Sequence, residues 1–77
     1  MRTDPDALKV LLRERGLRVT EPRVAVLGYL ASTDRHPTAE EVETAVNADG
    51  PILSRASVYN VLHSLTGVGL VAGMSLK

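Results

Sequence analysis

The sequence predicts a small, mainly α-helical domain with four helices followed by a short β-strand. The chain has 77 residues and a mass of 8.3 kDa, which is enough for one domain. Two tyrosines are its only aromatic residues, and cysteine is absent. The core must therefore consist of leucine, valine and alanine without disulfide bonds, and an aliphatic core of this size indicates packed helices.

Helix start and stop signals define the first two helices. The first is predicted to begin at Asp4 and Pro5 and to end at Gly16, because aspartate is a favoured N-cap, proline fits a first turn and glycine ends helices. Its apolar stripe, with the spacing i, i+3, i+4, is Leu8, Leu11 and Leu12. The second helix is predicted to begin at Thr20, with Pro22 in its first turn. Its buried stripe is Val26, Leu27 and Leu30.

Similar signals define the third and fourth helices. Thr38 and Glu41 have the spacing of a capping box, so a helix is predicted to start there. Its inward residues are Ala39, Val42 and Val46. Residues 47–51 combine asparagine, aspartate, glycine and proline, which predicts a loop. The fourth helix is predicted over residues 54–68, with Ser54 as its cap and a core stripe of Val58, Val61, Leu62 and Leu65.

A β-strand is predicted after the fourth helix, at residues 70–77, with Ile52 and Leu53 as a short pairing partner. Three helices, an amphipathic fourth helix and a strand are the element order of a winged helix-turn-helix, a three- to four-helix DNA-binding domain. Its β-wing is short and incomplete here, because the chain ends where a returning strand is expected. We therefore expect residues 1–77 to be one domain of a longer protein.

Charge is distributed unevenly along the chain, although nine basic and nine acidic side chains cancel overall. Residues 8–28 carry five basic and two acidic side chains, a net charge of +3. Residues 34–49 carry one basic and five acidic side chains, a net charge of −4, and residues 54–77 carry +2 from two basic side chains. Such a chain can turn a basic side toward a polyanion, while an ordinary solvated surface is the other explanation.

The outward face of the fourth helix is uncharged and consists of Ala56, Tyr59, Asn60 and His63. A helix face that serves only solubility usually carries glutamate and lysine. We therefore expect this face to contact a partner.

Several functions are not expected. No apolar run approaches the ~20 residues of a membrane helix, so we expect a soluble, cytoplasmic protein without membrane contact. Two rings do not form a stacking platform for single-stranded nucleic acid. An enzyme is not expected either, because the sequence has no phosphate-binding loop, no Ser-His or Cys-His pair and no carboxylate pair facing a cleft.

Four local motifs follow one another along the chain. They are Gly16-Leu17-Arg18-Val19-Thr20-x-Pro22-Arg23-x-x-Val26-Leu27, His36-Pro37-Thr38-Ala39-Glu40-Glu41-Val42, Ser57-Val58-Tyr59-Asn60-Val61-Leu62 and Gly69-Leu70-Val71. In this order and spacing they closely resemble the amino-terminal DNA-binding domain of the ferric uptake regulator family. Within that family, the run from Ser54 to Thr66 is most similar to the actinobacterial branch that regulates catalase-peroxidase genes.

The resemblance implies a metal- or peroxide-responsive transcriptional repressor that binds A·T-rich inverted repeats in double-stranded DNA as a homodimer. It also implies a second domain for dimerisation and metal binding, which is absent from this chain. The regulatory metal would be iron, manganese, zinc or nickel in the full-length protein, and no metal is expected to bind this chain tightly. By its place in the His-x-(Thr/Ser)-Ala-Glu motif, His36 would be a ligand of that metal, whereas a loop histidine taken alone is more simply an exposed one.

The same resemblance implies DNA contacts. Tyr59 matches a tyrosine that packs against thymine methyl groups, and Arg18 matches a basic residue that reaches an adjacent minor groove. Asn60 stands where many relatives have arginine, and its amide suits adenine rather than guanine. The other expected contacts, to phosphates or bases, are Arg23, Ser54, Arg55, Ser57 and His63.

Each assignment has a plainer explanation from the residues alone. Tyr59 can fold over the domain edge, Asn60 and Arg18 can be solvated, and Ser54 can serve as a helix cap. Arg23 can pair with an acidic neighbour. The alternative function for the whole chain is a small non-catalytic module whose basic face binds an acidic protein.

Overall fold

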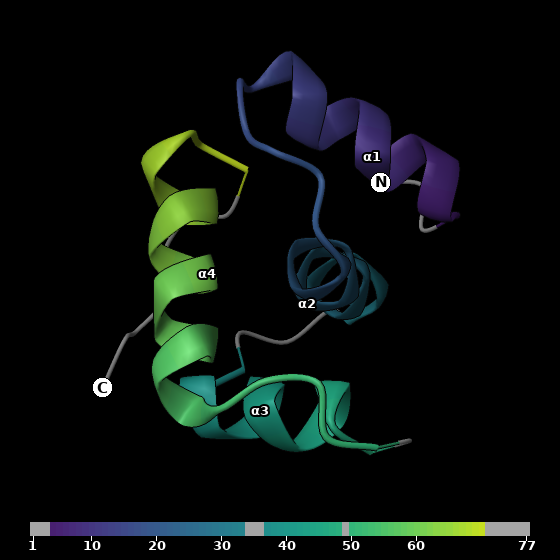
Figure 1. The fold of residues 1–77 in the computed structure, drawn as a ribbon. Helices are drawn as coiled ribbons and strands as arrows, with labels where there is room; N and C mark the ends of the chain where they lie inside the picture. The colour runs from purple at the N-terminus through teal and green to yellow at the C-terminus, as the bar shows by residue number, and fades with distance from the viewer. Residues whose placement is uncertain (1–3, 34–36, 49, 71–77) are drawn as a thin grey trace.

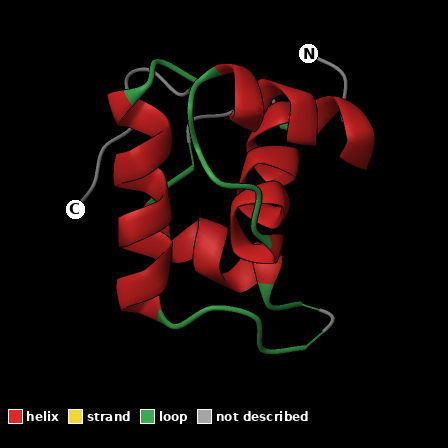
Figure 2. Cartoon of the chain, turned by 45° about the horizontal axis from the view of Figure 1, so that its top comes forward, coloured by secondary structure: helices red, strands yellow, loops and turns green. Residues whose placement is uncertain are grey.

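The computed structural model describes residues 4–33, 37–48 and 50–70 (Figure 1). In this part of the chain α1 spans Pro5–Glu14, α2 spans Glu21–Ser32, α3 spans Ala39–Val46 and α4 spans Arg55–Gly67. These described residues contain no strand (Figure 2). The prediction of a mainly α domain with four helices is therefore confirmed. The strand predicted at residues 70–77 lies outside the described residues except for Leu70, so the β-wing stays a prediction.

All four helices begin at the predicted caps. In each one the side chain of the N-cap accepts a hydrogen bond, of 3.1–3.2 Å, from the backbone N–H three residues further on. These N-caps are Asp4, Thr20, Thr38 and Ser54. Glu41 accepts a bond from the Thr38 N–H at 2.9 Å, which completes the predicted capping box. After α1, Gly16 has a φ of +77°, a left-handed conformation that favours glycine.

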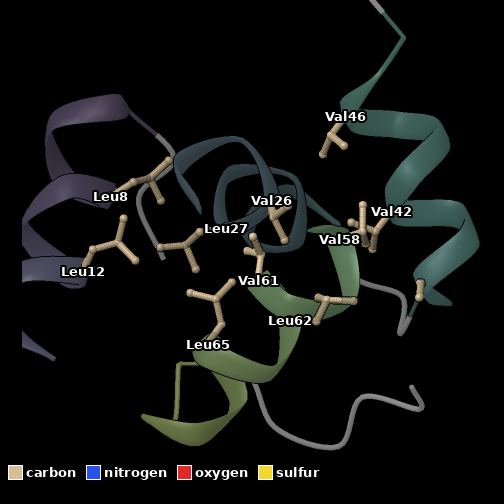
Figure 3. Packing of buried hydrophobic residues seen from close by; sticks show 11 residues of the cluster. Leu8, Leu12, Val26, Leu27, Val42, Val46, Val58, Val61, Leu62 and Leu65 are labelled. Carbon is tan, nitrogen blue, oxygen red and sulfur yellow. The ribbon is translucent and has the colours of Figure 1, made fainter. Parts of the chain in front are cut away.

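Aliphatic side chains from all four helices point toward one another and form one core (Figure 3). The central helix is α2, which packs against α1, α3 and α4, while α3 also packs against α4. The buried residues are Leu8, Leu12, Val26, Leu27, Ala39, Val42, Val46, Val58, Val61, Leu62 and Leu65. Leu11 and Leu30, which were predicted as core, are partly buried and pack against this cluster. Burial of each large side chain stabilises the fold by about 1.5–3 kcal/mol, so this core holds α4 firmly in place.

The loop between α3 and α4 is organised by one side chain, that of Asn47. Its Nδ2 donates to the carbonyl of Leu53 at 2.9 Å, and its Oδ1 accepts from the N–H groups of Ile52 at 2.7 Å and Leu53 at 3.0 Å. Ile52 and Leu53, expected as a strand partner, thus bond to a side chain and form no strand. The consequence is a short, fixed connection that sets the start of α4 beside the end of α3.

A second polar contact joins the two ends of the fold. Arg15, which follows α1, donates a 2.7 Å hydrogen bond from Nη1 to the carbonyl of Val68, the C-cap of α4. A cation at a helix C-terminus satisfies free carbonyls and opposes the negative end of the helix dipole. Among the described helices α1 packs only against α2, so this bond gives α1 a direct link to the end of α4.

No helix within the described ranges has the length and apolar character that crossing a membrane requires.

Candidate nucleic-acid interface

A shallow groove of about 400 Å³ lies between the start of α2 and the outer side of α4. Predicted DNA contacts from two separate segments meet in it: Arg18 and Arg23 from one, Ser57 and Asn60 from the other. Its remaining lining residues are Thr20, Pro22, Leu53 and Val61. The groove therefore combines two guanidinium groups with a hydroxyl and an amide, which are donors suited to an anionic, hydrogen-bonding partner.

The two arginines of the groove differ in how they are held. Arg23 is half-buried and donates from Nη1 to the carbonyl of Arg18 at 2.9 Å, while its backbone N–H bonds to the Thr20 side chain. Arg18 is exposed, and its side chain has no hydrogen-bond partner among the described residues. Arg23 thus fixes the segment that carries Arg18, and the Arg18 guanidinium is open to a partner.

Two serines at the start of α4 form a reciprocal pair. Ser54 Oγ accepts from the Ser57 N–H at 3.2 Å and donates to Ser57 Oγ at 3.0 Å. The predicted capping role of Ser54 is confirmed. Because the Ser57 hydroxyl oxygen already accepts a bond from Ser54, its own proton is available to a partner in the groove.

The outward face of α4 has the predicted composition. Ala56, Asn60 and His63 are exposed, and Tyr59 is half-buried and packs against the core. Partial burial of Tyr59 is consistent with both earlier explanations. The ring can cover the domain edge, or its exposed part can contact a partner. Its predicted role in DNA contact stays a prediction.

On the side of α4 that faces α3, the guanidinium group of Arg55 is paired with a carboxylate. Its Nε donates to Glu43 Oε1 of α3 at 2.9 Å, and the two side chains are 62% and 25% exposed. The hydrogen bond to Glu43 and the charge of Glu43 raise the pKa of Arg55, with smaller contributions from Glu40 and Tyr59. No local sequence pattern predicts this pair, since its members are separated by the α3–α4 loop. Thr20, predicted only as a helix start, is a second residue of the site that the sequence argument missed.

The metal prediction rests on His36. His36 lies in residues 34–36, outside the described residues. Within residues 4–33, 37–48 and 50–70, no three His, Asp or Glu side chains gather in a way that could hold a metal ion. The described residues alone therefore do not form the implied metal site, and the role of His36 stays a prediction.

Comparison with known proteins gives a consistent result. A family model described as the ferric uptake regulator family matches residues 14–77. The chain is 43% identical, over 60 residues, to proteins named peroxide-responsive repressor PerR from Staphylococcus aureus strains Mu50 and USA300. The matched part is 78% of this chain and 40% of each relative, so the chain spans about two fifths of their length. No solved structure matches it, and the expected actinobacterial branch stays a prediction.

Proposed function

This chain belongs to the ferric uptake regulator family, and from that premise we propose that it is the DNA-binding domain of a metal- or peroxide-responsive transcriptional repressor. The observation that carries the proposal is the groove beside α4, where Arg18, Arg23, Ser57 and Asn60 come together from two segments. Positive charge next to an exposed, uncharged helix face suits duplex DNA, because phosphates flank the base edges of a groove.

In this proposal α4 is the recognition helix and enters the major groove of an A·T-rich operator. Tyr59 packs against thymine methyl groups, and the exposed amide of Asn60 pairs with adenine N6 and N7. His63, one turn after Tyr59, contacts a base or a phosphate at the far end of the same face. The exposure of Asn60 and His63 supports these assignments.

The phosphate contacts come from both sides of the start of α4. Ser57 donates its hydroxyl proton, and Ser54 and Arg55 lie in the first turn of α4, where backbone N–H groups favour an anion. Arg23 supplies its remaining N–H groups beside them. Arg18 reaches an adjacent minor groove, where narrow A·T-rich DNA concentrates negative potential.

We further propose that this domain is part of a longer protein. That protein is a cytoplasmic homodimer that binds inverted repeats, with residues 70–77 starting the wing of each DNA-binding domain. His36 is one ligand of its regulatory metal, and a second domain supplies the others. When bound, the metal holds the dimer in the shape that fits DNA.

Fluorescence anisotropy with an A·T-rich inverted repeat and a scrambled duplex, across a salt series, tests the proposal. We expect tighter binding to the repeat and a linear fall of log K with log salt, because bound phosphates release counterions. No binding to either duplex at low salt would overturn the proposal and favour an acidic protein as partner. Equal affinity for both duplexes would remove operator recognition from this domain.

A matched pair of variants locates the contact surface. Arg18→Ala removes the open guanidinium of the groove, and Arg13→Ala removes an exposed charge of the same sign from α1. We expect the first to weaken binding and the second to change it little. Equal losses would mean that general positive charge, rather than the groove, binds the DNA.

A further inference from the structure

We infer that Glu43 is a positioning residue that fixes Arg55 for one DNA phosphate, and so increases the preference of the domain for its operator. The inference rests on the proposed function and deepens it. It starts from the contact between Arg55 Nε and Glu43 Oε1, which joins the first turn of α4 to α3.

Glu43 accepts a hydrogen bond from one atom of Arg55, and this leaves the other N–H groups of the guanidinium free to bind a partner. A guanidinium group has five N–H donors in a rigid plane, and Glu43 takes the one at Nε. The Nη1 and Nη2 atoms have no hydrogen-bond partner within the described residues, and the side chain is 62% exposed. Two parallel N–H groups therefore remain for a bidentate bond to phosphate, in a direction that the bond to Glu43 sets.

Buried packing holds the part of α3 that carries Glu43. Val42, its neighbour in α3, is fully buried, and α3 packs against both α2 and α4. The hydrogen bonds of Asn47 fix the loop that follows. Because α3 packs directly on α4 beside the base of the Glu43 side chain, the bond to Glu43 orients the guanidinium before DNA arrives, and less conformational entropy is lost on binding.

Charge cancellation gives the pair its effect on specificity. Non-specific binding depends on the net charge that phosphates meet, and the carboxylate of Glu43 offsets the charge of Arg55. A bidentate bond depends on direction as well, so Arg55 forms it only when α4 lies in the register of the operator. The pair thus adds little to binding of any duplex and more to binding of the correct one.

Two variants that remove the same charge from α3 test this inference. Glu43→Gln removes the acceptor of the Arg55 bond, whereas Glu40→Gln removes a carboxylate that acts on Arg55 by charge without a hydrogen bond to it. Both should tighten binding to scrambled DNA. We expect only Glu43→Gln to lower the ratio of operator to scrambled affinity, by about five-fold, the size of effect expected when one charge-assisted hydrogen-bond pair is no longer oriented.

A second background separates orientation of Arg55 from a structural role of Glu43. Arg55→Ala, and Arg55→Lys, which keeps the charge but lacks the planar fork, should each lower the ratio as Glu43→Gln does. Adding Glu43→Gln to Arg55→Ala should then leave the ratio of operator to scrambled affinity unchanged. A further fall in that double variant would assign Glu43 a structural role and overturn the inference.

The outcomes for the inference and for the proposed function are distinct. The unmodified chain could prefer the operator while Glu43→Gln and Glu40→Gln have the same ratio of operator to scrambled affinity. In that case the inference about Glu43 is wrong and the proposed function stands. If the unmodified chain has no preference, operator recognition fails, and the inference fails with it.

Discussion

The two sides of α4 carry the same type of cation in opposite settings. On the side facing α2, which we call the α2 flank, Arg18 and Arg23 line an open groove with Ser57 and Asn60. On the side facing α3, the α3 flank, Arg55 is bonded to Glu43, and Glu40 also acts on it. The position of an arginine near α4 therefore does not by itself determine what it contributes to DNA binding. That contribution depends on the hydrogen-bond and charge partners that the arginine already has within the protein.

In the proposed function, the two flanks contribute to DNA binding in different ways. An open cation such as Arg18 attracts any phosphate, and its effect decreases with salt. An engaged cation such as Arg55 adds little long-range attraction, but its remaining donors have a set direction. We therefore expect the α2 flank to supply most of the affinity and the α3 flank to affect mainly the choice of site.

The largest effect should come from Leu62→Ala, which removes the fully buried support of both flanks. We expect the free energy of unfolding to fall by about 2–5 kcal/mol, because lost burial and a new cavity add together. Urea denaturation followed by circular dichroism measures it. His63→Ala, an exposed neighbour on the same helix, is the control and should change stability by under about 0.5 kcal/mol. Similar losses for both variants would contradict the observed core.

A smaller effect should follow from Asn47→Ala, which disturbs only the α3 flank. The variant leaves the N–H groups of Ile52 and Leu53 without their acceptor, and we expect a loss of about 1–3 kcal/mol in stability. Amide hydrogen exchange should become faster at the start of α4 and stay unchanged at Arg23 in α2. Faster exchange throughout the chain would mean that the loop is not a local element.

The smallest effect separates the flanks by charge. Arg18→Ala should lower the slope of log K against log salt by about one, since it removes one cation that lies between the phosphates on either side of a minor groove. Arg55→Ala should lower it by clearly less, because Glu43 already offsets that charge. Anisotropy titrations on scrambled DNA at several salt concentrations measure both slopes. Equal changes would remove the distinction between the flanks.

Local patterns in the sequence predicted most of the fold. Every helix begins at the predicted cap, because a cap bond joins residues only three positions apart, as Thr38 and Glu41 do. The predicted stripes all face the core, although Leu11 and Leu30 are only partly buried, since helical periodicity determines which residues share a face.

Contacts between distant segments could not be predicted in the same way. The Arg55–Glu43 pair, the bond from Arg23 to the Arg18 carbonyl and the groove itself depend on how the helices pack and on where long side chains turn. Neither caps nor periodicity determine those features. Sequence patterns could name Arg18 and Arg55 as site residues, but they could not predict that one is open and the other engaged.

The bond between Arg15 and Val68 has a consequence for the order in which the protein folds. Its partners are 53 positions apart along the chain, whereas α2 contacts α3 and α3 contacts α4 across short connections. Contacts between near neighbours form early, and closing a long loop costs more chain entropy. We therefore expect this bond to form late during folding and to break early during unfolding, so that the end of α4 frays while Leu8 and Leu12 still hold α1 against α2.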